Sequence, residues 1–363
     1  MNAERLHAIV IALKKEMTAE RISSKMQNMV NCLEALVNLS NAPNQQNLAT
    51  SLDAMYAAIT DNDSDRFSPA WRQILREIGG EHLFGKRLKE DIETILATNQ
   101  ITLAVALQKL RETLEELQKF ENALNSAASA FQQLNIGDEK LQPGECEIGV
   151  LIPRQAVKNQ LLGFSEELRE LGFILNTFSE VATGKPSELE IKTLSSSDLL
   201  LHLLASAPYA ACLAVAIERI VGLYKQLLEI RKLHQEIRKQ GVPDEETTGI
   251  ENYANRLMEN GIDKASEEIV NDFYQGKDDG RKNELTVAVR LSMNKIANRI
   301  DHGFNLEVRV EPPAKDDSKP QSEQLQKAVA AIQSATASMQ FLKLEGQPLL
   351  KLPESIGKPK KKE

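Results

Sequence analysis

The feature that most constrains the fold is an uncharged apolar run from Leu199 to Ile217, which continues into a long amphipathic stretch ending at Gly241. A run of this length reaches the range of a membrane-spanning helix. Pro208 lies in its middle, and proline disfavours helix at the preceding residue while fitting a first helical turn. We therefore expect a short helix and then a second helix over residues 208–240, buried at the centre of a soluble protein. Membrane insertion of residues 199–217 is the alternative.

The helix expected over residues 208–240 carries an apolar seam. Starting at Leu213, steps of four, three, four and three residues are typical of heptad packing. The seam residues are Ile217, Ile220, Tyr224 and Leu227. The same stripe then becomes polar, at Arg231, His234 and Arg238. At 1.5 Å per residue the helix spans about 50 Å.

Residues 1–140 are predicted to be helical throughout, and the strongest signal lies in residues 102–134. Four heptads with charged flanks, interrupted only by Glu121, predict a coiled-coil helix. Its interface leucines are Leu103, Leu107, Leu110, Leu114, Leu117 and Leu124. This helix matches residues 208–240 in length, so the two seams could pair with each other or with a second copy of the chain.

Residues 144–313 are predicted to form an α+β core. Alternating apolar residues indicate three short strands, at residues 148–152, 189–193 and 306–310. Ser195 to Asp198 are interpreted as the cap of a helix that begins at Leu199. Helices are expected over residues 155–178, 250–258, 263–274 and 285–300, with a polar loop at 275–282.

Residues 314–363 are predicted to be a linker, an alanine-rich helix to about Met339 and a basic tail. The tail carries Lys358, Lys360, Lys361 and Lys362. Such a tail offers at most a weak contact with phosphates of nucleic acid or lipid. The chain as a whole has a net charge of −8, which does not favour nucleic acid as a partner.

Composition supports a predominantly helical α+β fold, with long coiled-coil-like helices around a small sheet of about three strands. Aromatic residues make up only 4% of the 363 residues, and leucine, alanine, glutamate and lysine are frequent. The cysteines Cys32, Cys146 and Cys212 are far apart and odd in number, which predicts no disulfide framework. No signal peptide is recognised, so a cytoplasmic location is expected.

The sequence reveals no strong catalytic constellation. None of the five histidines stands at a metal-pair spacing with another histidine or cysteine, so we predict no metal and no cofactor. The catalytic candidates are Arg154, Asp198, His202 and Glu218. We expect them to lie near the end of the sheet, where buried charges must be paired. The polar group from Asn298 to Gly303 is interpreted as a helix terminus.

One resemblance is carried by residues 145–240. The segments FSEVATG at 178–184, LSSSDLLLHLLASAP at 194–208 and AIERIVGLYKQLLEIRKL at 216–233 resemble uncharacterised bacterial proteins, some of them encoded on mobile or phage-defence islands. The resemblance implies a role in antiviral defence but no activity, and it assigns a role to no residue.

Three functions remain open from the sequence. The leading hypothesis is a cytoplasmic helical scaffold or interaction protein whose coiled-coil seams bind a second copy or a partner protein. The second is a membrane-active effector that inserts residues 199–217. The third is an enzyme with an unrecognised polar site near residues 198–219.

Overall fold

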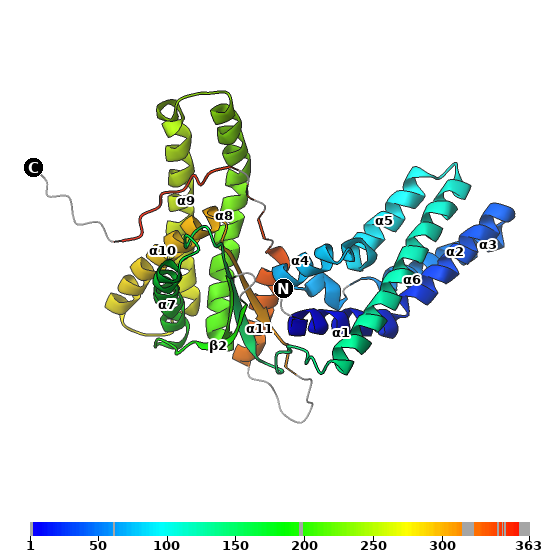
Figure 1. Cartoon of the computed structure of the whole chain (residues 1–363), viewed down its shortest axis with the longest axis horizontal. Helices are drawn as coiled ribbons and strands as arrows, with labels where there is room; N and C mark the ends of the chain where they lie inside the picture. The colour runs from blue at the N-terminus through cyan, green and yellow to red at the C-terminus, as the bar shows by residue number, and fades with distance from the viewer. Residues whose placement is uncertain are drawn as a thin grey trace, which may run out of the picture. The chain divides into compact units, whose positions relative to one another are not determined.

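The structure is a computed structural model that describes residues 3–60, 62–195, 199–313, 323–339, 341–342, 344 and 346–355. The chain divides into two compact units, Met1–Lys140 and Leu141–Glu363. Over the described residues, eleven α-helices accompany one antiparallel sheet of four strands (Figure 1). The predicted class, a predominantly helical α+β fold, is confirmed.

Unit 1 is helical. Its main helices are α1 (Ala3–Glu20), α2 (Ile22–Asn38), α3 (Ala42–Ala58), α4 (Pro69–Glu77), α5 (Gly85–Thr98) and α6 (Leu103–Gln133). Two of the starts follow from local chemistry, since the side chains of Asn41 and Ser68 accept hydrogen bonds from backbone N–H groups in the first turns of α3 and α4. Proline in those turns lacks an N–H that would otherwise be unpaired.

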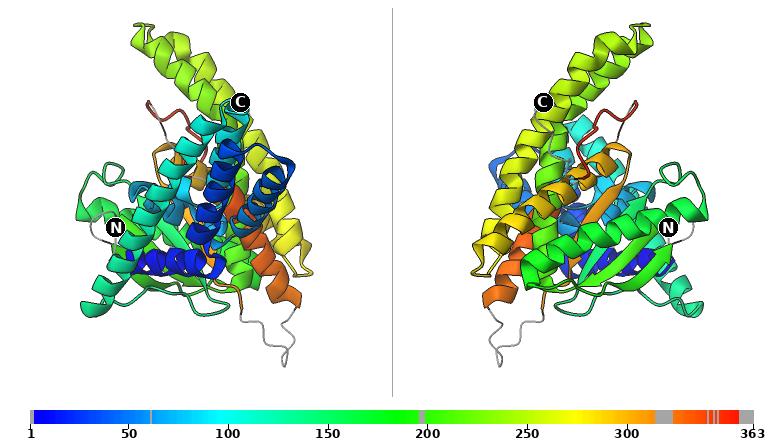
Figure 2. Two further views of the ribbon diagram at one scale, coloured as in Figure 1. Left: turned by 90° about the vertical axis from the view of Figure 1, so that its right-hand side faces the viewer. Right: turned by 90° about the vertical axis from the view of Figure 1, so that its left-hand side faces the viewer.

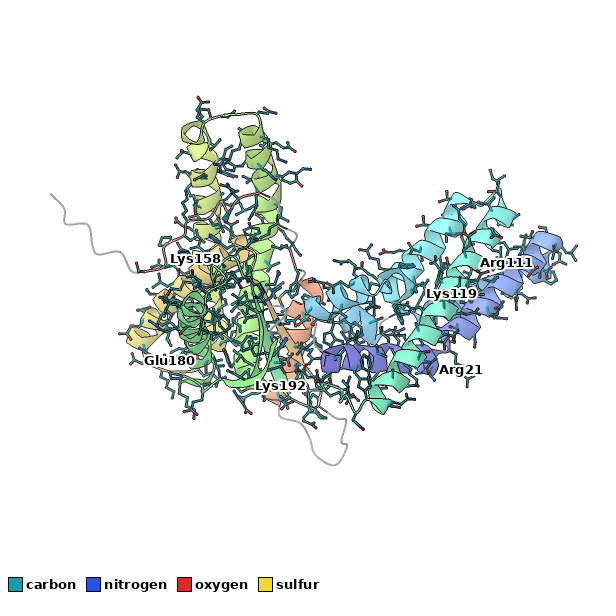
Figure 3. The ribbon with its side chains drawn as sticks, viewed as in Figure 1. Arg21, Arg111, Lys119, Lys158, Glu180 and Lys192 are labelled. Carbon is teal, nitrogen blue, oxygen red and sulfur yellow. The ribbon has the colours of Figure 1, made fainter. Side chains whose placement is uncertain are left out.

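The apolar seam of α6 is covered inside unit 1. Leu107, Leu110, Leu114, Leu117 and Leu124 are buried, and Leu103 is partly buried. They pack in one core with α1, α2 and α5. The charged residues of α6, such as Arg111 and Lys119 in Figure 3, lie on its solvent-exposed side. These leucines, predicted to be interface residues, are covered by other helices of unit 1.

The sheet of unit 2 contains β1 (Cys146–Ile152), β2 (Glu190–Ser195), β3 (Leu199–Ala205) and β4 (Asn305–Val310), in the order β2-β3-β1-β4. The expectation of three strands was one too few. The missed strand is β3, the first half of the apolar run, which was predicted to be a helix. Because β3 lies between two neighbours and has leucines on both faces, its period-two pattern is hidden in a continuous apolar run. Leu199 thus begins a strand and not the expected helix, and Ser196 to Asp198, interpreted as part of the cap of that helix, lie outside the described residues.

The helices of unit 2 surround one long central helix. They are α7 (Leu161–Thr183), α8 (Ala207–Lys239), α9 (Asp244–Phe273), α10 (Asp279–Asp301) and α11 (Glu323–Ser338). The sheet presents Ile148, Val150, Leu203 and Val308 to α8, and α7, α9, α10 and α11 pack around that helix. α8 and α9 run side by side as a long hairpin, whose far end extends beyond the sheet (Figure 2).

The second half of the apolar run lies inside this core. All four seam residues of α8 are buried: Ile217, Ile220, Tyr224 and Leu227. By length and composition, α8 is the one helix of the described residues that could cross a membrane, and 67% of its most apolar window is buried in the unit. A core helix of a folded unit passes the same test, so α8 by itself does not favour a membrane span.

Three helix boundaries differ from the sequence-based expectation. Residues 153–160 form turns, with Lys158 and Asn159 at positive φ, so α7 begins at Leu161 and not at residue 155. α9 continues through Gly261, where the absence of a Cβ leaves room for the side chain of Leu223 on α8. α10 begins at Asp279, because the side chain of Asp278 caps it within the expected loop.

The three cysteines should differ in reactivity. Burial raises the pKa of the Cys146 thiol to about 12 and also raises that of Cys212, whereas Cys32 is partly exposed. Because the thiolate is the nucleophile, we expect one thiol to react rapidly with a disulfide reagent in the native protein and three in denaturant. Peptide mapping should locate the fast site at Cys32. Rapid native labelling of Cys212 would contradict the buried position of α8.

Candidate functional site

The four predicted catalytic residues do not form a site in the part of the chain that the structure describes. Arg154 is exposed in the turn after β1, where its guanidinium donates to the side chain of Asn159. Glu218 lies on α8, the helix that packs on the apolar face of the sheet, and its carboxylate accepts a hydrogen bond from Ser338 on α11. Asp198 lies outside the described residues. His202 points to the sheet face opposite α8, so it does not meet Glu218.

His202 belongs to a different set of polar groups on that opposite face. In the register, His202 and Glu307 flank Gly149 on either side. His202 Nδ1 lies 3.3 Å from Glu147 Oε1, and the same oxygen lies 3.4 Å from the Arg309 guanidinium. Within the described residues, no group of three or more His, Cys, Asp or Glu side chains is arranged to hold a metal ion.

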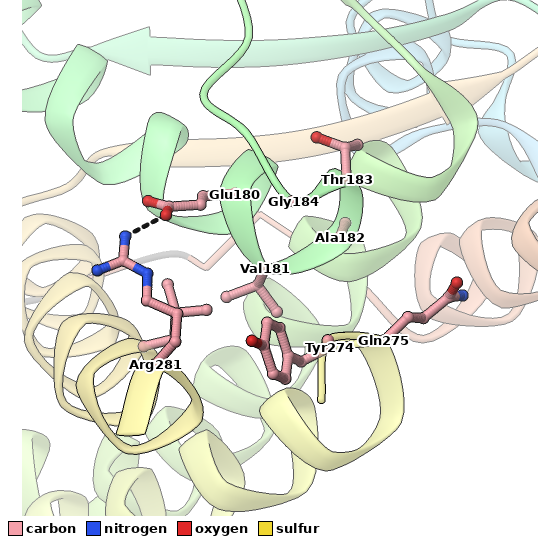
Figure 4. A pocket seen from close by; sticks show the side chains of 10 residues that line it. Glu180, Val181, Ala182, Thr183, Gly184, Tyr274, Gln275 and Arg281 are labelled. Atoms are coloured by element: carbon pink, nitrogen blue, oxygen red, sulfur yellow. Dashed lines mark hydrogen bonds and ion pairs between the residues drawn. The ribbon is translucent and has the colours of Figure 1, made fainter. Parts of the chain in front are cut away.

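A small pocket lies at the C-terminal end of α7. It has a volume of about 350 Å³ and is lined by Glu180 to Gly184, by Tyr274 to Gly276, and by Arg281 and Leu285. Figure 4 shows Glu180 and Arg281 joined by an ion pair at its edge. Arg281 also pairs with Glu284. The charges of this ion-pair cluster are therefore already engaged with one another.

The most elaborate polar arrangement holds residues 346–354, which we call the strap. The strap is an extended segment without helix or strand, drawn in red where it passes α8 and α9 in Figure 1. Its apolar residues Leu349, Leu350 and Leu352 are buried, at 1%, 3% and 4% exposure. Leu350 and Leu352 join the same core as α8 and α10.

Four consecutive backbone N–H groups of the strap donate to side chains of the helices. Those of Leu349 and Leu350 donate to Asp301 Oδ2, at 2.6 and 2.7 Å. That of Lys351 donates to Asn255 Oδ1 at 2.7 Å, and that of Leu352 donates to Asn298 Oδ1 at 3.0 Å. The prolines on either side, Pro348 and Pro353, have no N–H. Every backbone donor from 348 to 353 is thus accounted for.

The backbone carbonyls of the strap accept from the same helices. The Asn298 amide donates to the carbonyl of Leu352 at 3.0 Å, so this one side chain pairs with both polar groups of a single residue. The amide of Asn255 donates to Leu349 at 3.3 Å, and that of Asn294 to Pro353 at 2.9 Å. Arg231 donates to the carbonyl of Gly346 at 2.7 Å. These contacts bind peptide groups and do not depend on the identity of the strap side chains.

Asp301 is the buried anchor of this arrangement. Its side chain is fully buried, and its Oδ1 accepts from Tyr224 and from the guanidinium of Arg231. Burial, and then the charge of Asp301, raise the pKa of the Tyr224 hydroxyl, which therefore stays protonated and donates. A buried charge is costly unless it is paired. The carboxylate of Asp301 is therefore held where it can accept from α8 through one oxygen and from the strap through the other.

Helical spacing brings the binding side chains to one side. Asn294, Asn298 and Asp301 recur after four and three residues, and so lie on one face of α10. Glu251 and Asn255 are four residues apart on α9, and Arg231 comes from α8. We refer to these six side chains as the strap site.

The strap site was not predicted from the sequence, although two parts of it have a recognisable pattern. The apolar stripe of α8 becomes polar from Arg231 onward, and Asn298 to Gly303 form a compact polar group. The overlooked signal was the sequence of the strap. Between two prolines it contains two leucines, one polar residue and a third leucine. The lysines that follow it, predicted to be a basic tail, lie outside the described residues.

Comparison with known proteins gives no relative from which a site could be transferred. No protein-family model matches the chain. Neither the curated proteins nor the solved structures give a significant match.

Proposed function

We propose that the protein is a cytoplasmic helical scaffold or interaction protein whose strap site binds an extended segment of a partner protein. The observation that carries the proposal is the pairing of four consecutive strap N–H groups with side chains of α9 and α10. Side-chain amides that pair with peptide groups can hold any extended chain that supplies suitable apolar side chains. In this structure the strap, a segment of the same chain, occupies the site.

Two other proposals from the sequence receive less support. The seams of α6 and α8 are buried within single units, which leaves them unsuited to self-association. Enzymatic activity is not part of the proposal, because Arg154, His202 and Glu218 lie apart. The association with bacterial defence stays a prediction from the sequence.

The membrane-active alternative has its own experiment. It would require the run 199–217 to leave both the sheet and the core, because the run is divided between β3 and α8. Flotation of the full-length protein with anionic lipid vesicles tests it. Recovery with the vesicles would favour this alternative over the scaffold proposal.

The scaffold proposal predicts that the strap site accepts a peptide in trans. The double substitution Leu349→Asp/Leu350→Asp in the full-length chain should free the site, because two charged residues cannot occupy buried apolar positions. We expect a fluorescein-labelled peptide with the sequence of residues 346–355 to bind this strap-disabled chain saturably in an anisotropy titration.

Controls connect that binding with the site. Adding Asn298→Ala to the strap-disabled chain should weaken the binding of the peptide by about tenfold or more, since the two hydrogen bonds between Asn298 and Leu352 are lost. Asn31→Ala, at an exposed asparagine of α2, should leave the affinity unchanged. The less disruptive Leu350→Ala serves if the double variant does not fold. Absence of peptide binding in both variants would refute the proposal.

A further inference from the structure

We infer that the strap site selects a partner segment with the pattern apolar–apolar–any–apolar–proline–acidic, and that the strap competes with this segment in cis. The inference rests on the proposed function and adds to it the chemistry of the partner and the way in which access is controlled.

The apolar positions of the pattern are inferred from the burial of the corresponding strap side chains. Leu349, Leu350 and Leu352 are almost fully buried, whereas the side chain of Lys351 is 76% exposed. A charged residue at a buried position would have to lose its hydration without a partner. The position of Lys351 tolerates other residues, because its ammonium makes only an exposed ion pair with Glu251, at 3.0 Å.

The proline and the acidic position of the pattern are inferred from Pro353 and Glu354 at the end of the strap. Pro353 holds φ near its extended value and also biases Leu352 to an extended conformation, which reduces the entropy lost on binding. The carboxylate of Glu354 accepts from Asn298 at 2.7 Å, and its other oxygen lies 4.0 Å from Arg299. An acidic residue after the proline is therefore favoured over a basic one.

Competition follows from the connection of the strap to the rest of unit 2. Met339, directly after α11, is buried in the core, and only residues 340–345 separate it from the strap. A segment tethered so closely has an effective concentration in the millimolar range. α8, α9 and α10 also contact one another directly, so their packing does not depend on the strap alone. A partner segment must therefore outcompete the strap before it binds.

The test compares labelled peptides on two full-length proteins, the native chain and the strap-disabled chain. On the strap-disabled chain, Leu350→Asp in the 346–355 peptide should weaken binding by at least about tenfold. Pro353→Ala should weaken it by about two- to fivefold. Lys351→Ala should change it by less than about threefold, as expected for an exposed side chain. The unmodified peptide should bind the native chain at least about tenfold more weakly than the strap-disabled chain.

The outcomes separate this inference from the proposed function. If a scrambled peptide bound the strap-disabled chain as tightly as the native sequence, the inferred pattern would be wrong. The proposed function, binding of an extended segment, would still hold. Equal affinity of the unmodified peptide for the two chains would overturn the competition. Hydrogen exchange gives a second readout, since peptide binding to the native chain should expose the amides of Leu349 to Leu352. Continued protection of those amides at saturating peptide would also contradict displacement.

Discussion

Asp301→Ala is expected to lower the free energy of unfolding of unit 2 by about 3–5 kcal/mol, the range found when one partner of a buried ion pair is removed. The substitution leaves the guanidinium of Arg231 buried beside Tyr224 without its carboxylate, and removes the acceptor of two strap N–H groups. Amide hydrogen exchange in α8 and α10 should accelerate by about 100-fold or more, because 1.4 kcal/mol corresponds to tenfold.

Glu268→Ala is the matched control. It also removes a carboxylate beside an arginine of α8, but the Glu268 and Arg219 side chains are 43% and 54% exposed and 3.7 Å apart. Such surface pairs contribute about 0–1 kcal/mol, so exchange in the same helices should hardly change. Similar effects of the two substitutions would show that Asp301 is not the buried anchor of the strap site.

Leu110→Ala in α6 is expected to lower the free energy of unfolding of unit 1 by about 2–5 kcal/mol. Leu110 is fully buried in the core of that unit, and the deletion leaves a cavity. Trp71, the one tryptophan of the chain, packs against the same core and reports its unfolding by fluorescence. Because the α6 seam is covered within one chain, the urea midpoint should not depend on protein concentration.

An exposed leucine provides the comparison for this experiment. Leu134, at the end of α6, is 69% exposed, so Leu134→Ala should change the free energy of unfolding by less than about 0.5 kcal/mol. A midpoint for Leu110→Ala that rises with protein concentration would indicate that the α6 seam is an interface between copies.

The local features of the fold could be predicted because neighbouring residues produce them. Heptad spacing predicted α6 and the helix that α8 forms from Pro208 onward. Alternation predicted β1, β2 and β4, each of which has a polar or charged residue beside its apolar ones. β3 was missed because its leucines face both sides of the sheet, and pairing with β1 and β2 decides the conformation of such a run.

The catalytic candidates illustrate the limit of reasoning from proximity in sequence. His202 and Glu218 are only sixteen positions apart, yet a strand and the first turns of a helix separate them onto opposite sides of the sheet. Asp301 and Leu349, by contrast, are 48 residues apart and share a hydrogen bond. Hydrogen bonds of this kind depend on where whole helices pack.

The sequence by itself determined that the chain is mostly helical, that its long helices each have an apolar stripe, and that these stripes must be covered. It did so because helical period and side-chain polarity are properties of neighbouring residues. Only the tertiary structure decided what covers each stripe, that half of the apolar run is a strand, and that Arg231, Asn255, Asn298 and Asp301 meet around the C-terminal segment. Those results depend on the packing of residues that are far apart in the chain, which no local pattern encodes.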